Sequence, residues 1–198
     1  MILQKCKLCR REGQKLLLKG ERCLTTKCAF TRRAYAPGEH GQSFRGKQSE
    51  YGKQLREKQK ARRIYGIDET QFANYIDVAN TMVGNNAENL LKLLELRLDN
   101  IIFRLGFANS RAQSRQYSAH GLFKVNGHTV TIPSYIVKIG DVIEPKNKAF
   151  FKEIEGNKSI SWLEFDSKKL TGKVTHIPSR EEIDTPVNES LIIEFYSR

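Results

Sequence analysis

Apolar residues between positions 68 and 121 repeat with the period of amphipathic helices. Asp68 and Gln71 form a capping box ahead of an apolar face that ends at Ala79, and Gly84 then interrupts the pattern. Further along, apolar residues follow the i, i+3, i+4, i+7 spacing at Leu98, Ile101, Ile102 and Leu105. The sequence therefore predicts helical stretches over about residues 68–79, 90–105 and 110–120.

The pattern changes to that of short strands after residue 121. Asn126-Gly127 suits the tight turn of a β-hairpin over residues 122–130, because both central positions of a type I′ turn need positive φ angles. Further strand candidates are residues 135–137, 141–143, 161–165 and 173–177. The C-terminal stretch 188–196 is ambiguous between strand and helix, and its asparagine cap favours a helix. The patterns predict an α+β fold in which helices precede a small antiparallel sheet.

Basic residues are concentrated in the first third of the chain. The 198 residues include 34 Lys plus Arg and 22 Asp plus Glu, a formal net charge of +12. Up to Tyr65 there are 18 basic and 5 acidic residues, whereas the remainder has 16 and 17. This surplus indicates a polyanionic partner and is unlike the mixed surface of a metabolic enzyme. No apolar run approaches the ~20 residues that cross a bilayer, and no signal-peptide pattern is found, so we expect a cytoplasmic protein with no membrane partner.

Residues 37–63 offer little to bury on a protein core. Their large apolar residues are only Phe44, Tyr51 and Leu55. From position 50 to 64 the residues are good helix formers with charge on every side, as in a helix packed against something other than its own protein. We expect this segment to become ordered on a phosphate backbone, and a solvated helix face is the alternative.

The four cysteines all lie within the first 28 residues, as C-x2-C-x13-C-x4-C. Two close pairs with a hairpin-sized spacer suit a tetrahedral Zn²⁺ site, since each pair supplies two thiolates and the spacer lets the chain return. Four thiolates leave no position for a substrate, so this metal would be structural. An Fe–S cluster on the same cysteines is the alternative, and a catalytic redox pair is less favoured because it needs no second pair.

Four arginines mark two of the predicted helices. Arg97 and Arg104 lie seven residues apart, outside the apolar face, and Arg111 and Arg115 lie one turn apart near the amino end of the next helix. We expect four exposed guanidinium groups that form a second RNA-binding surface, since the planar fork grips phosphate oxygens. The alternative is that they pair internally with Asp99, Asp141 or Glu144.

No sequence pattern for catalysis is found. The histidines have no motif linking them to a nucleophile or a metal: they are His40, His120, His128 and His176. A Gly-rich phosphate loop of the P-loop type is also missing. We therefore expect a binding protein and not an enzyme.

Several longer stretches carry a family resemblance. They are residues 6–13 (CKLCRREG), 18–23 (LKGERC), 36–41 (APGEHG), 97–100 (RLDN), 103–108 (FRLGFA), 110–113 (SRAQ) and 191–198 (LIIEFYSR). In this order, and over nearly the whole chain, they resemble the bacterial family of small-subunit ribosomal protein four, in its cysteine-containing, metal-binding branch. The resemblance implies a structural protein that binds 16S rRNA directly, nucleates assembly of the body of the small subunit and contributes to translational accuracy. It also implies small-subunit ribosomal protein five as a neighbour, mRNA at the entry channel as a further contact, and no homo-oligomer.

The patterns and the resemblance together predict four regions. They are a metal-binding basic region (1–45), a helical domain (46–86), an RNA-binding module with an antiparallel sheet (87–177) and a C-terminal segment that packs back on the helical domain (178–198). The expected Zn²⁺ or Fe–S ligands are Cys6, Cys9, Cys23 and Cys28. The expected RNA-binding residues are Lys5, Lys7, Arg10, Arg11, Arg22, Arg32, Arg33, His40, Arg45, Lys47, Lys53, Arg56, Lys58, Lys60, Arg62, Arg63, Arg97, Arg104, Arg111, Arg115 and Lys124.

Two other functions fit the sequence less well. An RNA-modifying enzyme such as a pseudouridine synthase can carry a similar module, but only about fifty residues then remain, too few for a catalytic domain. A zinc-dependent DNA-binding regulator would show one recognition helix, whereas the basic residues here are spread over several elements, which suits one irregular RNA.

Overall fold

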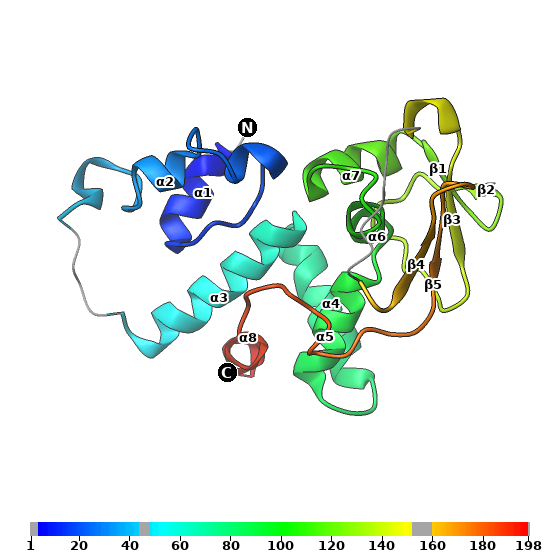
Figure 1. Ribbon diagram of the computed structural model, residues 1–198. Coiled ribbons are helices and arrows are strands. Elements are labelled where there is room, and N and C mark those ends of the chain that lie inside the picture. Colours follow the sequence, from blue (N-terminus) through cyan, green and yellow to red (C-terminus); the bar gives the residue numbers. More distant parts are fainter. Residues whose placement is uncertain (1–3, 44–47, 152–159, 198) are drawn as a thin grey trace.

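The computed structural model describes residues 4–43, 48–151 and 160–197 (Figure 1). Its first group of elements is helical: α1 (Lys5–Glu12), η1 (Gly20–Cys23), α2 (Ala29–Arg32), η2 (Glu39–Gly41), α3 (Glu50–Tyr65), α4 (Glu69–Thr81) and α5 (Asn86–Glu95). The second group contains α6 (Leu98–Arg104), α7 (Arg111–Ala119), β1 (Phe123–Val125), β2 (His128–Thr129), β3 (Val142–Pro145), η3 (Lys148–Phe151), β4 (Leu163–Asp166) and β5 (Thr171–Val174), and α8 (Glu189–Tyr196) ends the chain. Within these ranges no helix is both long and apolar enough to span a bilayer. The expected α+β fold class is confirmed.

Side-chain caps begin several helices where the sequence predicts them. The Asp68 carboxylate accepts a hydrogen bond of 2.8 Å from the backbone N–H of Gln71 and begins α4. Ser110 caps α7 and Asn188 caps α8 in the same way. Each such cap satisfies a backbone donor that the helix leaves free and contributes about 1 kcal/mol. The C-terminal stretch is therefore the helix that its asparagine favours.

The strands form one antiparallel sheet in the order β2-β1-β3-β5-β4. The predicted hairpin joins β1 and β2, and its turn residues Asn126 and Gly127 have φ angles of 50° and 82°. Residues 135–137 are not a strand but contribute an isolated bridge to Arg97. The strand expected over residues 173–177 lies earlier, as β5. The sequence thus predicts the sheet and its turn better than the bounds of its later strands.

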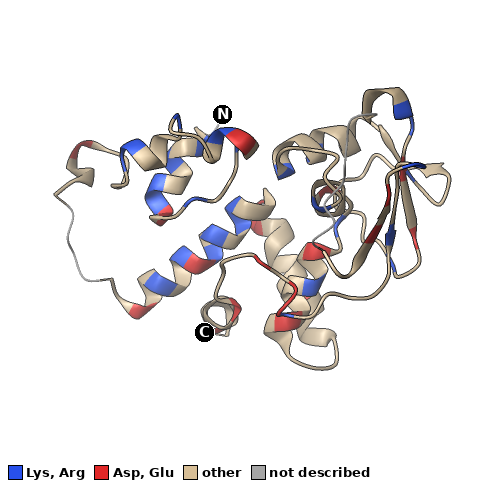
Figure 2. Cartoon of the chain, viewed as in Figure 1, with Lys and Arg blue, Asp and Glu red and all other residues tan. Residues whose placement is uncertain are grey.

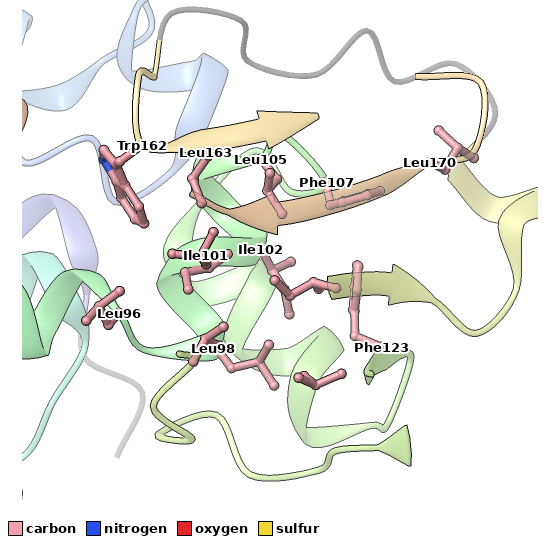
Figure 3. Packing of buried hydrophobic residues seen from close by; sticks show 14 of the residues in the cluster. Leu96, Leu98, Ile101, Ile102, Leu105, Phe107, Phe123, Trp162, Leu163 and Leu170 are labelled. Atoms are coloured by element: carbon pink, nitrogen blue, oxygen red, sulfur yellow. The ribbon is translucent and has the colours of Figure 1, made fainter. Parts of the chain in front are cut away.

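Each of the two groups of elements has its own hydrophobic core. The first lies among α1, α3, α4, α5 and α8 and contains Ile64, Phe72, Leu90, Leu94 and Ile192. The second lies between α6 and the sheet, where Figure 3 shows Ile101, Ile102, Leu105, Phe123 and Leu163. The helix α5 therefore packs in the first core, although the sequence analysis assigns its residues to the RNA-binding module.

The C-terminal segment returns from the sheet to the helical group. After β5 the chain runs back past α5, and α8 packs against α3 and α5 (Figure 1). The ring of Phe195 lies 5.5 Å from the ring of Tyr51, and the Tyr196 hydroxyl donates to the Glu69 carboxylate at 2.8 Å. The last helix is thus part of the first core.

Candidate nucleic-acid interface

Exposed basic side chains gather on α1, η1, α2 and the loops between them, where they form what we call the N-terminal cation surface. Its members are Lys7, Arg11, Lys15, Lys19, Arg22, Lys27, Arg32 and Arg33. In the part of the chain that the structure describes, none of them pairs with a carboxylate, and Glu21 is the one exposed acidic side chain among residues 4–34. Figure 2 shows that this end of the molecule is rich in Lys and Arg. An unneutralised surplus of this kind attracts a polyanion.

Arg10 supports this surface from within. Its Nε donates to the Tyr35 carbonyl at 2.9 Å and its Nη2 to the Ala36 carbonyl at 3.2 Å, while its guanidinium lies 4.8 Å from the centroid of the Tyr35 ring. Arg10 therefore ties the loop after α2 to α1. The expected site residue His40 is exposed in η2, and Lys5 is half-buried in α1.

Two further candidates, Arg45 and Lys47, lie outside the described residues.

The four cysteines come from α1, η1 and the position before α2. Cys9, Cys23 and Cys28 are buried free thiols, and Cys6 is half-buried. Burial raises the pKa of Cys9, a backbone hydrogen bond at Leu16 opposes this, and negative charge on the other three cysteines raises it further. The chemistry of four thiolates suits a soft metal ion. Among residues 4–43, 48–151 and 160–197, no group of three or more His, Cys, Asp or Glu side chains stands in a metal-binding arrangement.

The structure corrects the expected environment of α3. All six of its basic side chains form ion pairs within the chain: Lys53–Glu50, Arg56–Glu12, Lys58–Glu69, Lys60–Glu57, Arg62–Glu69 and Arg63–Glu12. Lys58 and Lys60 are buried, and α8 packs on the helix. The expectation that α3 lies against something other than its own protein, and needs a ligand to become ordered, is wrong. Glu12 lies 44 residues from Arg56 in the sequence, so local composition does not reveal that pair, whereas Glu50 and Glu57 belong to α3 and Glu69 follows it closely.

Glu12 is the main link between α1 and α3. Its side chain is only 1% exposed, between the guanidinium groups of Arg56 and Arg63. Burial raises the pKa of Glu12, while Arg63 and then Arg56 pull it down. Two cations that were expected to bind RNA thus share one carboxylate, which offsets one of their two positive charges.

Arg97 and Arg104 are the second correction, because both are buried and not exposed as expected. Arg97 donates from Nε and Nη2 to the two Asp99 oxygens at 3.0 and 2.6 Å, and from Nη1 to the Tyr75 hydroxyl at 2.7 Å. Arg104 donates from Nε and Nη2 to the two Glu95 oxygens at 2.9 and 2.8 Å. Arg104 therefore holds the junction between α5 and α6, Arg97 ties the start of α6 to α4, and neither presents a free fork to a phosphate.

Glu95 is the centre of this junction, and the sequence analysis overlooks it. It is fully buried, and besides Arg104 it accepts from the Tyr65 hydroxyl and Asn100 Nδ2, both at 2.6 Å. Burial alone would raise the pKa of Glu95, but Arg104, and after it Arg111 and the Tyr65 hydroxyl, lower it to about 2. Thr185 of the C-terminal segment touches the same carboxylate at 3.4 Å. The junction thus joins three segments that no local pattern relates.

The remaining module candidates are partly accessible. Arg111 is half-buried, donates from Nε to Asn100 at 2.7 Å and lies over the rings of Tyr65 and Phe103. Arg115 has a side chain 42% exposed and reaches Asp99 at 3.3 Å, so the internal pairing considered as the alternative is present there. Lys124 is half-buried in β1.

Three members of the N-terminal cation surface are missing from the sequence-predicted set. They are Lys15, Lys19 and Lys27, all exposed. The signal that identifies them is the charge surplus of the whole first third, because they carry no motif of their own.

Comparison with known proteins matches the sequence to two domain families. Residues 2–95 match the ribosomal protein S4/S9 N-terminal domain, and residues 96–143 match the S4 domain. The boundary falls between α5 and α6, where the two cores also divide. The chain is 58% identical to small ribosomal subunit protein uS4 of Caldicellulosiruptor bescii, with 98% of this chain and 96% of the relative covered. It is 56% identical to protein uS4A of Alkaliphilus metalliredigens and 54% identical to uS4 of Acetivibrio thermocellus, with the same coverage.

Proposed function

The chain belongs to the S4 family of small-subunit ribosomal proteins, and we propose that it is a structural component of the small ribosomal subunit that binds 16S rRNA directly. It is not an enzyme, as its relatives are ribosomal proteins over nearly their whole length. The observation that carries the binding mode is the N-terminal cation surface, whose eight side chains have no carboxylate partner among the described residues. Each phosphate that such a cation neutralises releases counterions from the RNA.

The salt dependence of binding tests this proposal. The variant Arg22→Glu/Lys27→Glu/Arg33→Glu reverses three exposed charges on the N-terminal cation surface. We expect weaker binding to purified 16S rRNA, and a log–log salt slope lowered by about one unit for each phosphate that the variant no longer neutralises. The matched control is Lys168→Glu/Lys169→Glu/Lys173→Glu, which reverses three exposed charges at the far end of the sheet. An unchanged slope in the first variant, or an equal fall in the control, would contradict the proposed interface.

A second measurement tests the ribosomal role itself. Tagged protein produced in cells should co-sediment with small subunits and their precursors on a sucrose gradient. Nuclease treatment should release it together with rRNA fragments. Sedimentation only as free protein would overturn the assignment to the subunit.

Three finer roles are part of the proposal and rest on the family resemblance. The chain nucleates assembly of the subunit body, contributes to translational accuracy, and lies beside small-subunit protein five, with mRNA at the entry channel as a further contact and no homo-oligomer. Reconstitution of small subunits without this chain should stall early, and chemical cross-linking of complete subunits should join it to protein five. Normal assembly without the chain would contradict the first role.

We also propose that the four cysteines bind one structural metal ion, with Zn²⁺ favoured over an Fe–S cluster. The support is the set of four thiols within the first 28 residues, three of them buried, and the negative charge of the other three cysteines, which raises the pKa of Cys9. A bound cation would compensate the negative charge of four thiolates and couple its binding to the local fold.

A further inference from the structure

A groove of about 690 Å³ lies where the N-terminal region meets the rest of the chain. Three segments line it: α1 with the following loop, the end of α3, and the first turn of α7. In Figure 1 these segments converge between the two groups of elements. The groove is separate from the N-terminal cation surface, because none of that surface's eight residues lines it.

The groove is lined by apolar and by basic side chains, which we call its floor and its rim. The floor is formed by Leu8, Leu16, Leu17, Leu18, Ile64 and Ile67. The basic residues that line the groove are Lys5, Arg62, Arg63, Arg111 and Arg115, and the acidic one is Asp68. Arg62, Arg63 and Arg115 pair with carboxylates elsewhere in the chain, whereas Lys5 and Arg111 have no carboxylate partner among the described residues. A wall of this kind suits a ligand with a flat apolar body and a negative group.

Arg111 is one of the two cations of the groove that have no carboxylate partner among the described residues. Only its Nε has a hydrogen-bond partner among the described residues, and its guanidinium is held 5.1 Å from the centroid of the Tyr65 ring and 4.7 Å from that of Phe103. Held in this way, the group loses little freedom when it binds a phosphate. On the opposite wall, Arg62 Nε is buried and has no partner among the described residues. An unsatisfied buried donor is costly unless a ligand or water completes it.

We propose that this groove takes one unpaired nucleotide of the bound RNA, with its base on the leucine floor and its phosphate on Arg111. The volume is that of a site for a single small ligand, roughly 300–1,000 Å³, and is too small for a duplex. Unpaired bases are the parts of a structured RNA that splay out and stack on side chains, including arginine planes. This inference rests on the proposed rRNA binding and specifies a position within it.

Filling the groove without changing charge tests the proposal. Ala112 is exposed in the first turn of α7 and lines the groove, whereas Ala119 is exposed at the end of the same helix and does not. We expect Ala112→Trp to weaken binding of the full chain to 16S rRNA by about fivefold or more, because one base can no longer stack in the groove. The salt slope should stay unchanged, because no cation is removed. The control Ala119→Trp should bind as the parent does.

Photo-cross-linking with 4-thiouridine-substituted 16S rRNA identifies the occupant. We expect a cross-link to the peptide containing residues 16–18 or 64–67, from a nucleotide that is unpaired in the bound RNA. Equal binding by Ala112→Trp and the parent, or cross-links to these peptides only from paired nucleotides, would overturn the groove proposal while leaving rRNA binding intact. The proposal also fails if Ala112→Trp binds naked rRNA normally and loses only incorporation into subunits, since the occupant is then a protein side chain. Failure of the parent chain to bind 16S rRNA would instead overturn the proposed function.

Discussion

The buried pair Arg104–Glu95 gives a sharp test of whether these arginines stabilise the fold or bind RNA. The variant Arg104→Met keeps much of the side-chain volume and leaves the Glu95 carboxylate buried without its guanidinium. Breaking a buried ion pair from one side costs about 3–5 kcal/mol. The pKa of Glu95 gives a similar figure, because a shift from 4.5 to about 2 corresponds to about 3 kcal/mol of interaction with the charged form. The additional pair with Asp184 adds little, since that carboxylate is 76% exposed.

Urea unfolding measures this loss through Trp162. It is the only tryptophan, is 1% exposed and lies in the second core, so its fluorescence reports the unfolding of the module. We expect Arg104→Met to lose about 3 kcal/mol of unfolding free energy at pH 7. The double variant Arg104→Met/Glu95→Gln should regain part of it, because the buried charge is gone. Affinity for rRNA should stay unchanged where the protein is folded. A loss below about 1 kcal/mol together with weaker rRNA binding would refute this reasoning and make Arg104 an RNA contact.

Three further predictions follow from single features. Because the folded-state pKa of Glu95 is about 2, below its usual 4.5, the stabilisation by its charge is present above pH 4.5 and is lost as the pH falls toward 2. Glu95→Gln should therefore flatten that part of the plot of unfolding free energy in urea against pH, and an equally steep plot would contradict this. Elemental analysis should find zinc or iron, and Cys9→Ser or Cys23→Ser should speed proteolysis before residue 35 while tryptophan fluorescence stays native; purified protein free of both metals would rule the site out. Gly172→Ala should lower the unfolding free energy by about 1–3 kcal/mol in thermal unfolding, as an added Cβ would come within 2.3 Å of Leu105 Cδ1, and an unchanged melting temperature would show that the core yields there.

Features that depend on neighbouring residues could be predicted from the sequence. The cap at Asp68, the turn at Asn126-Gly127 and the apolar face of α6 each follow from a few adjacent positions, and the structure has all three. Hydrogen bonding and φ preference act over two to four residues, so the sequence contains the whole cause. The order of the later strands does not follow in this way. β4 comes between β3 and β5 in the sequence, but in the sheet β3 pairs with β5 and β4 lies at the edge.

The environment of a charge depends on which residues the folded chain brings beside it. The sequence of α3 indicates a free basic helix because four of its six cations pair outside it, with Glu12 on α1 and Glu69 on α4. Arg97 and Arg104 do not belong to the hydrophobic repeat of α6. Both are nevertheless buried beside its apolar face, where Arg97 pairs with Asp99 and Arg104 with Glu95. Periodicity shows which face of a helix is apolar, but it does not show which polar side chains are buried in contact with a charged partner.

This distinction limits how much of the net charge can act on RNA. Of the 18 basic residues up to Tyr65, the six in α3 share four carboxylates, so two of their positive charges are not offset, and eight others are exposed without a carboxylate partner in the described residues. If every one of those eight neutralised a phosphate, this surface would contribute a salt slope of about 6–7, whereas all 18 would give about 13–16. The carboxylates on α1, α4 and α3 therefore act on binding indirectly. They offset four of the six positive charges of α3, so most of the charge available to a phosphate backbone lies on the N-terminal cation surface.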